Sequence, residues 1–351
     1  MIRVGLIGAG SIAEYHARAL AKAPGIEVAA VCDVNLVRAQ AFATTYGIPV
    51  AVGSIEELLS MGTIDAVTIG IWNAAHASVA IQALDAGKHV FCEKPMARNA
   101  IEAQSMVAAE SNSGKLLMIG LVRRYELRTE IARDIVRRGE LGNVYYARAG
   151  YLRRDGQPGG WFTSREHAGG GALLDIGIHS LDLALHLADL GTVERVSGFT
   201  RQLPSIMDAI IGTEKYVSKD SAGERDVEDH AFATLTFRDG GLLTIEASWA
   251  QHRERDTQYL ELYGERGGLV VDPALHLSRN AGNALSDTTF PLVEPGDRLQ
   301  EMFDREMAHF AACLNDGVRC MSPSADGLEL MRIIDAIYRS ASEGREVRLA
   351  E

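Results

Sequence analysis

The sequence predicts an α/β protein of two domains: a doubly wound parallel sheet over residues 1–121, then an α+β domain over residues 122–351 with a large, mainly antiparallel sheet. Length is the first indication, because single cores stop growing near about 250–300 residues and this chain has 351. The second is that short, continuous apolar runs alternate with helix-period segments up to residue 120. After residue 121 half-buried strand patterns replace them.

Five apolar runs in the first domain read as strands buried on both faces of a sheet. They are residues 2–8, 28–33, 65–70, 88–92 and 115–120. Helical patterns separate them at residues 12–22, 36–46, 75–86 and 98–113. The alternation is the βαβαβ pattern of a parallel sheet covered by helices.

The second domain begins with a predicted helix over residues 126–139, a strand over 143–153 and a helix around 172–187. Half-buried strands are expected at residues 193–202, 229–238, 241–251, 257–264 and 268–272. Asp239-Gly240 lies between two of these and is a hairpin signal. Two helices, about 297–315 and 324–342, close the chain, and the last can pack back on the first domain.

Composition excludes several classes of partner. The net charge is −12 and the pI is near 5.4, which argues against a nucleic acid. Arginines crowd residues 123–154, but most are expected on solvated faces. We expect no membrane partner, because we find no apolar stretch long enough to span a bilayer and no signal peptide. Four cysteines without a CxxC pair favour a reducing cytoplasm.

The stretch GLIGAGSIA contains Gly8-x-Gly10-x-x-Ala13, a form of the dinucleotide-binding fingerprint, between a predicted strand and a predicted helix. Gly8 allows the tight turn, and Gly10 allows the close approach of a pyrophosphate. The helix that follows, with Ser11 and Ile12 at its start, presents an N-terminus that attracts phosphates. We therefore predict a Rossmann domain that binds a nicotinamide dinucleotide.

Asp33 ends the second strand, 20 residues after Ala13. A carboxylate at this place accepts hydrogen bonds from the adenosine ribose and repels a 2′-phosphate, so the predicted cofactor is NAD. Arg38 lies five residues further on and can blunt that preference, which leaves NADP as the alternative cofactor.

The stretch FCEKPMA places Lys94 directly after a predicted core strand. Ligands of open α/β sheets bind outside the carboxyl ends of the strands, so this lysine is expected to reach the cofactor crevice. There it can hydrogen-bond a substrate oxygen or act as acid or base. Pro95 fixes the local backbone. A surface lysine beside a helix-starting proline remains the alternative.

The stretch GGGALLDIGIHSLD places Asp175 and His179 four residues apart on a predicted helix, hence on one face. A carboxylate beside an imidazole suits removal of a hydroxyl proton while hydride leaves the same carbon. Asp182 and His186 follow seven residues later, so a metal site is an alternative. We predict no metal, because NAD chemistry needs none, and we expect Asp182 and His186 to be structural.

Candidates for substrate binding carry a weaker signal. Arg123 and Tyr125 follow the last strand of the first domain and are expected at the cleft edge. Trp161 precedes the glycine run, and Trp249 ends a strand of the second domain. Indole faces suit the C–H surfaces of sugars, and arginine suits hydroxyls or carboxylates. Core packing and surface ion pairs are the alternatives for each.

Together these features resemble the glucose–fructose oxidoreductase, inositol dehydrogenase and MocA family over nearly the whole chain. The resemblance rests on the glycine loop and on residues 73–97, 169–182 and 326–349. It implies NAD(P)-dependent oxidation or reduction of a sugar, inositol or related polyol. Closed homo-oligomers are the default for such enzymes, so a homodimer or homotetramer is expected.

The resemblance also implies roles for individual residues. His179 would be the acid/base on the reacting hydroxyl, Lys94 would hydrogen-bond its oxygen, and Asp175 would position substrate and histidine. Asn73 and His76 match an N-x-x-H feature near the nicotinamide, although Ile71-Trp72 replace the family's frequent Thr-Pro. Glu93 would contact the cofactor ribose or brace Lys94. Two other functions remain open: NAD-dependent glycoside cleavage through transient oxidation, and a non-catalytic sugar sensor.

Overall fold

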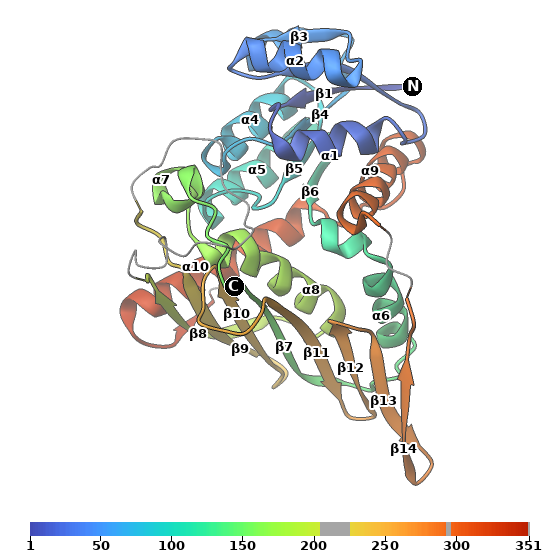
Figure 1. Ribbon diagram of the computed structural model, residues 1–351, viewed down its shortest axis with the longest axis vertical. Helices are drawn as coiled ribbons and strands as arrows, with labels where there is room; N and C mark the ends of the chain where they lie inside the picture. Colours follow the sequence, from blue (N-terminus) through green and yellow to red (C-terminus); the bar gives the residue numbers. More distant parts are fainter. Residues whose placement is uncertain (204–224, 293–295, 350–351) are drawn as a thin grey trace. The chain divides into compact units, whose positions relative to one another are not determined.

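The first part of the chain forms a six-stranded parallel sheet with the order β3-β2-β1-β4-β5-β6 in the computed structural model, which describes residues 1–203, 225–292 and 296–349 (Figure 1). Its strands are β1 (Ile2–Ile7), β2 (Ile26–Cys32), β3 (Val50–Val52), β4 (Ala66–Ile69), β5 (His89–Glu93) and β6 (Leu117–Gly120). Ile7 pairs with Cys32 on one side and Ile69 on the other, so the strand order reverses at β1. That reversal is where ligands of such sheets bind.

Helices connect these strands at α1 (Ser11–Leu20), α2 (Leu36–Tyr46), α3 (Ile55–Ser60), α4 (Asn73–Asp85) and α5 (Ala100–Ser113). The predicted strands and helices are all present, with shifts of a few residues at their ends. β3 and α3 were not predicted. They are short, three and six residues, and too brief to show a hydrophobic period.

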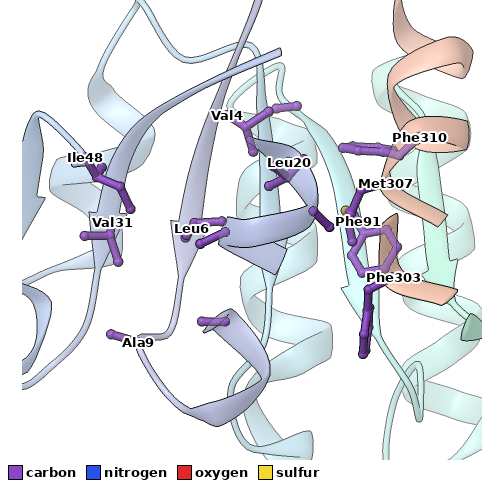
Figure 2. Close-up of a cluster of buried hydrophobic side chains, with 14 of the residues drawn as sticks. Val4, Leu6, Ala9, Leu20, Val31, Ile48, Phe91, Phe303, Met307 and Phe310 are labelled. Carbon is purple, nitrogen blue, oxygen red and sulfur yellow. The ribbon is translucent and has the colours of Figure 1, made fainter. Parts of the chain in front are cut away.

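A helix from the far end of the sequence completes the first core. In α9 (Arg298–Asp316), the side chains of Phe303, Met307 and Phe310 lie against Leu20 of α1 and Phe91 of β5 (Figure 2). Phe91 and Phe310 meet edge to face at 5.8 Å between ring centroids. Burial of these large apolar side chains stabilises the sheet that carries the site.

The chain divides into two compact units. One unit holds residues 1–125 together with α9 and the following chain as far as Met331. The other holds residues 126–292 and the chain from Arg332 on. The sequence placed the boundary after residue 121, whereas η1 (Val122–Tyr125), a 3₁₀ turn, still belongs to the first unit. The final helix, α10 (Ser324–Glu343), contributes residues to both units.

The second unit is built on a nine-stranded mixed sheet with the order β14-β13-β12-β11-β7-β10-β9-β8-β15. Figure 1 labels its strands from β7 to β14. The predicted strands correspond to β7 (Val144–Leu152), β8 (Val193–Arg201), β9 (His230–Phe237), β10 (Leu242–Ser248), β11 (Thr257–Gly264) and β12 (Gly267–Asp272). β7 and β10 pair in parallel, and every other pairing is antiparallel. The sheet is therefore mainly antiparallel, as predicted.

Three further strands were not predicted: β13 (His276–Ala281), β14 (Ala284–Thr289) and β15 (Val347–Arg348). β13 and β14 have mostly exposed or half-buried side chains, so they lack the apolar alternation that marks a half-buried strand. β15 has two residues. The sheet is thus wider than the sequence pattern indicated.

Besides its part of α10, the second unit contains α6 (Leu127–Arg137), α7 (Arg165–Ala168) and α8 (Ile178–Ala188) among the described residues. α8 packs on β7, β10 and β11. A π-helical turn, η3 (Leu173–Gly177), precedes α8. The segment Arg165–Ala188 is, among the described residues, long and apolar enough to cross a membrane, contrary to the sequence expectation. However, 78% of its apolar window is buried inside the protein, as in a core helix.

Candidate active site

The glycine loop lies between β1 and α1 and has the backbone geometry that a dinucleotide needs. Gly8 has φ of +101°, and a Cβ there would lie 2.4 Å from the Gly70 carbonyl oxygen at the end of β4. A Cβ at Gly10 would meet nothing within 4 Å, which leaves room for a pyrophosphate. Gly10 is also the N-cap of α1 and supplies no capping side chain. The loop fits a cofactor phosphate at the helix N-terminus.

Asp33, directly after β2, ties the second strand to the glycine loop. Its Oδ2 accepts the Ala9 amide at 3.0 Å, and its Oδ1 accepts the Asn35 amide at 2.8 Å. The Arg38 guanidinium also donates to Oδ1, at 3.0 Å. The acid is thus oriented by the loop that would carry the pyrophosphate. Arg38, half-exposed, forms an ion pair with Asp33.

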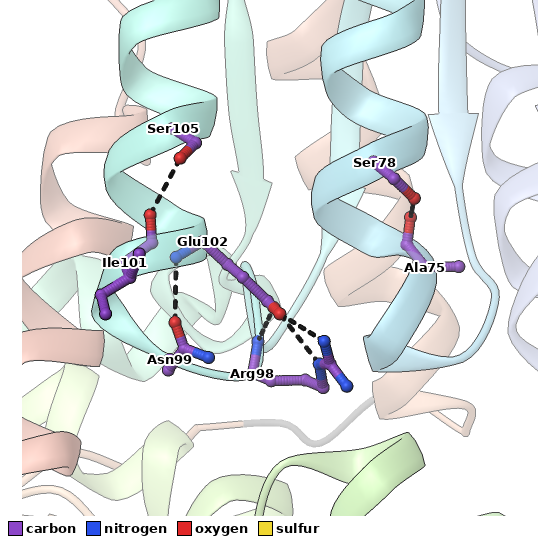
Figure 3. Close-up of polar contacts among 7 residues, drawn as sticks. All are labelled: Ala75, Ser78, Arg98, Asn99, Ile101, Glu102 and Ser105. Carbon is purple, nitrogen blue, oxygen red and sulfur yellow. Dashed lines mark hydrogen bonds and ion pairs between the residues drawn. The ribbon is translucent and has the colours of Figure 1, made fainter.

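Lys94 lies in the loop that follows β5, and from Val90 to Ala97 it is the one residue that is not buried. The next helix anchors this loop (Figure 3). Asn99 caps α5 by accepting the Glu102 amide at 2.9 Å, and the Glu102 carboxylate accepts the Arg98 amide at 3.0 Å. This reciprocal cap fixes the far end of the loop, so the lysine projects from a rigid segment.

Glu93 braces the same loop from its other end. Its Oε2 accepts the Lys94 amide at 3.2 Å, and its Oε1 lies 2.9 Å from Nε2 of His16 on α1. His16 is 1% exposed and packs edge-on against Phe91 and Phe303. Sequence reasoning missed His16. The available signal was a polar residue inside the apolar stripe of Ala13, Ala17 and Leu20.

His76 joins two loops at the carboxyl edge of the sheet. Its Nδ1 lies 2.8 Å from the Pro95 carbonyl oxygen, after β5, and its Nε2 lies 3.1 Å from the Ile71 carbonyl oxygen, after β4. The ring is buried, and burial lowers the pKa of His76, which favours the neutral imidazole. Asn73, also buried, is the first residue of α4. The N-x-x-H pair therefore lies beside the loop of Lys94.

In the second unit, Asp175 and His179 are both half-buried, whereas every other residue from Gly171 to Ala184 is buried. Asp175 lies in the π-helical turn η3, and His179 lies in the first turn of α8. Such turns are rare and often occur at functional sites. The sequence pattern predicted a regular helix here. The backbone instead changes its winding between the two predicted catalytic residues.

Trp249, which follows β10, orients Asp175. Its indole Nε1 donates to Asp175 Oδ2 at 2.9 Å, and the residue is 0% exposed. The suggestion that its face could stack on a sugar is therefore wrong. The pKa of Arg153, after β7, is raised: burial lowers it, but Tyr151 and Asp175 outweigh burial. Sequence reasoning missed Arg153, which adds a cation near the carboxylate of Asp175.

Two of the four weaker substrate candidates, Trp161 and Arg123, remain candidates. Trp161 is half-buried in η2 (Gly160–Thr163) and stacks on Phe162 at 3.9 Å between ring centroids. Arg123 lies in η1 and is largely buried. Tyr125 is 2% exposed within the first core, and its hydroxyl lies 3.3 Å from Ser322 Oγ. A substrate cannot reach a side chain so placed, so we leave Tyr125 out of the site.

Asp182 and His186, the alternative metal ligands in the sequence, both lie on α8. Asp182 is buried, whereas His186 is half-buried. A different group, His309, Cys313 and Cys320, has ligand atoms within 4.8 Å of one another. Nε2 of His309 accepts the Met321 amide at 2.9 Å, so its lone pair already serves the backbone. This group is best explained as a structural contact at the end of α9.

Replacing Trp249 with Phe tests the contact with Asp175. The change removes one N–H donor and leaves an apolar ring, so we expect kcat to fall about tenfold, equal to roughly 1.4 kcal/mol. Phe237→Leu, a buried aromatic on β9 of the same sheet, is the control for lost packing. Steady-state kinetics that show equal kcat in both variants would contradict the role of the indole.

The glycine loop at the reversal in strand order of the parallel sheet has the geometry of a dinucleotide-binding fold. Residues 2–121 match the description "Oxidoreductase family, NAD-binding Rossmann fold", and residues 129–270 match the "GFO/IDH/MocA C-terminal domain". The chain belongs to the GFO/IDH/MocA family of oxidoreductases. The predicted fold, enzyme class and NAD-binding domain are thereby confirmed.

Named relatives cover almost the whole chain. D-glucoside 3-dehydrogenase of Escherichia coli is 33% identical over 99% of this chain and 97% of its own length. 1,5-anhydro-D-fructose reductase of Ensifer adhaerens is 32% identical over 99% of both chains. The solved structure of levoglucosan dehydrogenase with NADH and levoglucosan has a TM-score of 0.87, at 24% identity and full coverage of both chains. That likeness supports the fold.

Proposed function

We propose that this protein is an NAD-dependent dehydrogenase that oxidises a ring hydroxyl of a pyranose sugar or glycoside. His179 removes the hydroxyl proton, and Lys94 donates a hydrogen bond to the same oxygen and stabilises its developing charge. Asp175, oriented by the Trp249 indole, positions the substrate and the histidine. The bound cofactor would accept the hydride, with Gly8, Gly10, Ser11, Ile12 and Asp33 holding its phosphates and ribose.

One observation carries the assignment. Lys94, Asp175 and His179 are partly exposed, while the residues next to each of them along the chain are buried. A partly exposed polar side chain inside an otherwise buried stretch costs free energy of folding. Such a residue is therefore expected where its side chain acts on a ligand. Lys88, by comparison, is buried and donates to the Ile64 carbonyl at 2.7 Å, as expected of a structural lysine.

The sugar class rests on the relatives. The D-glucoside 3-dehydrogenase and the 1,5-anhydro-D-fructose reductase are both named for six-carbon ring sugars. Trp161, stacked on Phe162, offers an aromatic face for the C–H surface of such a ring, and Arg123 offers donors for hydroxyls. Inositols and other polyols remain within the same chemistry and belong in the test.

The deciding experiment is a substrate panel of methyl glucosides, free aldoses, anhydrosugars and inositols, each with NAD and with NADP. Formation of reduced nicotinamide with a keto-sugar product is the expected result. Release of an aglycone without net reduced cofactor would instead indicate glycoside cleavage through transient oxidation. Tight cofactor and sugar binding without turnover on any substrate would indicate a sensor and would contradict the proposed enzyme.

Cofactor preference gives a separate prediction. Asp33→Asn keeps hydrogen-bonding groups near the Ala9 amide but removes the charge that repels a 2′-phosphate, and it frees Arg38 to bind that phosphate. We expect the ratio of kcat/KM for NADP to that for NAD to rise at least about tenfold. In the double variant with Arg38→Ala the gain should disappear. Equal kcat/KM values for the two cofactors in the wild type would contradict the role of Asp33.

We further propose that the protein forms homodimers or homotetramers and works in a reducing cytoplasm, as its four free cysteines suggest. One face of the nine-stranded sheet carries η3 and α8, which pack on β10. The opposite face exposes Phe199, which pairs with Phe232 across β8 and β9. Light scattering after size exclusion, with Phe199→Asp as the disrupting variant, measures this assembly.

A further inference from the structure

We propose that Glu228 is the positioning residue of the catalytic helix: its carboxylate holds the backbone that sets Asp175 and His179. This inference rests on the proposed function, because it concerns the same two residues. Glu228 lies on the approach to β9, far from them in sequence, and is 4% exposed. It does not belong to the motifs that indicated the site.

Three donors converge on the Glu228 side chain. The Gly171 amide lies 3.0 Å from both carboxylate oxygens, and the Leu173 amide donates to Oε1 at 3.0 Å. The Tyr338 hydroxyl of α10 donates to the same Oε1 at 2.9 Å. Amides at the start of a helix have no intrahelical acceptor, so a buried carboxylate is a strong cap for them. Burial raises the pKa of Glu228, whereas these donors act to lower it.

The backbone carries this restraint to Asp175. The Glu228 carbonyl accepts the Ala172 amide at 3.1 Å, and the Gly171 carbonyl accepts the Asp175 amide at 2.9 Å. The side-chain carboxylate and the backbone carbonyl of Glu228 therefore both accept hydrogen bonds from the turn at which η3 begins. A shift of the Gly171 peptide would move the Asp175 backbone directly.

The same segment reaches Asp175 by a second route. The carbonyl of Asp229, the next residue, accepts the Trp249 amide at 2.9 Å. The indole of Trp249 then donates to the Asp175 carboxylate. Residues 228 and 229 thus fix the backbone of Asp175 through one chain of hydrogen bonds and its carboxylate through another. Two restraints from one segment define both the position and the orientation of the Asp175 carboxylate.

The glycine run provides independent support. A Cβ at Gly171 would lie 1.9 Å from the Glu228 carbonyl oxygen, and a Cβ at Gly170 would lie 2.1 Å from the Tyr338 hydroxyl. The glycines therefore admit the Glu228 backbone and the Tyr338 ring. The absence of side chains at Gly170 and Gly171 lets Glu228 approach closely enough to cap the helix.

The test compares Glu228→Leu, Glu228→Gln and Tyr338→Phe. Leu removes every acceptor, Gln retains a carbonyl oxygen that can occupy the Oε1 position, and Phe removes one donor. We expect kcat to fall about a hundredfold for Leu, and several-fold for Gln and for Phe, with the Kd for NADH unchanged. Amide hydrogen exchange of peptides covering residues 169–180 should accelerate in the same order. Val196→Ala shortens a buried side chain on β8 and is the control for general destabilisation.

Exchange and turnover together separate the outcomes. Faster exchange with wild-type kcat would overturn the positioning role, and so would a kcat loss in Val196→Ala equal to that of the Glu228 variants. If Glu228→Leu does not fold, Tyr338→Phe decides, because it removes only one hydroxyl. If the wild type turns over no sugar, the proposed function fails, and the exchange data still show whether Glu228 holds the helix: unchanged exchange overturns the inference.

Discussion

Lys94→Ala should lower kcat by about 10²- to 10⁴-fold, the range in which a positioned acid or base contributes to catalysis. Removing the ammonium takes away the proposed hydrogen bond to the reacting oxygen and the charge that stabilises it. The loop itself should survive, because Glu93 holds the Lys94 amide rather than its side chain and Asn99 caps the helix beyond. Stopped-flow kinetics and NADH fluorescence titration measure turnover and cofactor binding separately.

The matched control is Lys22→Ala. Lys22 is well exposed on the first unit and forms an ion pair with Asp304, so its loss removes a lysine and a surface contact without touching the loop. Turnover in that variant should match the wild type. A Lys94→Ala enzyme that keeps more than a tenth of the wild-type kcat across the substrate panel would remove Lys94 from the mechanism.

Gly171→Ala should destabilise the second unit and also abolish most of the turnover. The new methyl group would lie 1.9 Å from the Glu228 carbonyl oxygen, so either the β9 approach or the start of η3 must move. Overpacking of this kind costs about 3 kcal/mol, and more where backbone must shift. We expect the free energy of unfolding to fall by that amount. We expect kcat to fall further than the loss of stability explains, because the Asp175 amide is hydrogen-bonded to the Gly171 carbonyl of the same turn.

Gly62→Ala is the control, since a Cβ at Gly62 meets nothing within 4 Å. Its stability should match or slightly exceed the wild type, because alanine restricts the unfolded chain. Urea denaturation and kinetics on both variants distinguish the steric account from a general intolerance of alanine. A Gly171→Ala protein with wild-type stability would contradict the close approach.

The sequence predicted the cofactor-binding unit almost completely, because its signals are local. Strands buried on both faces appear as continuous apolar runs, and the glycine loop, Asp33 and Lys94 each follow such a run directly. In a parallel sheet, strand ends share one edge, so sequence position alone predicts that these residues are neighbours. His16 escaped this logic, because its partner Glu93 is set by packing. His76 was indicated by the resemblance, but its contacts with the Pro95 and Ile71 carbonyls were not.

In the second unit, local sequence patterns predicted less of the site, and tertiary packing decided more of it. The spacing of Asp175 and His179 predicted a regular helix, and the π-helical turn that contains Asp175 could not be inferred from residue type. Tyr125 and Trp249 are residue types that occur in sugar sites, yet tertiary packing buries both. Tyr125 lies in the first core, and Trp249 is buried with its indole hydrogen-bonded to Asp175. Residue type indicates what a side chain can do, whereas burial determines whether a ligand can reach it.

By itself, the sequence determined the fold class, the cofactor loop and the catalytic candidates Lys94, Asp175 and His179, because each depends on short-range pattern. Only the tertiary structure decided what supports them: Glu228, Tyr338 and Trp249 come from distant segments and meet the glycine run and Asp175 through long-range hydrogen bonds. Such contacts produce no periodic pattern in the sequence, because residue type alone does not show whether a glutamate is buried or exposed.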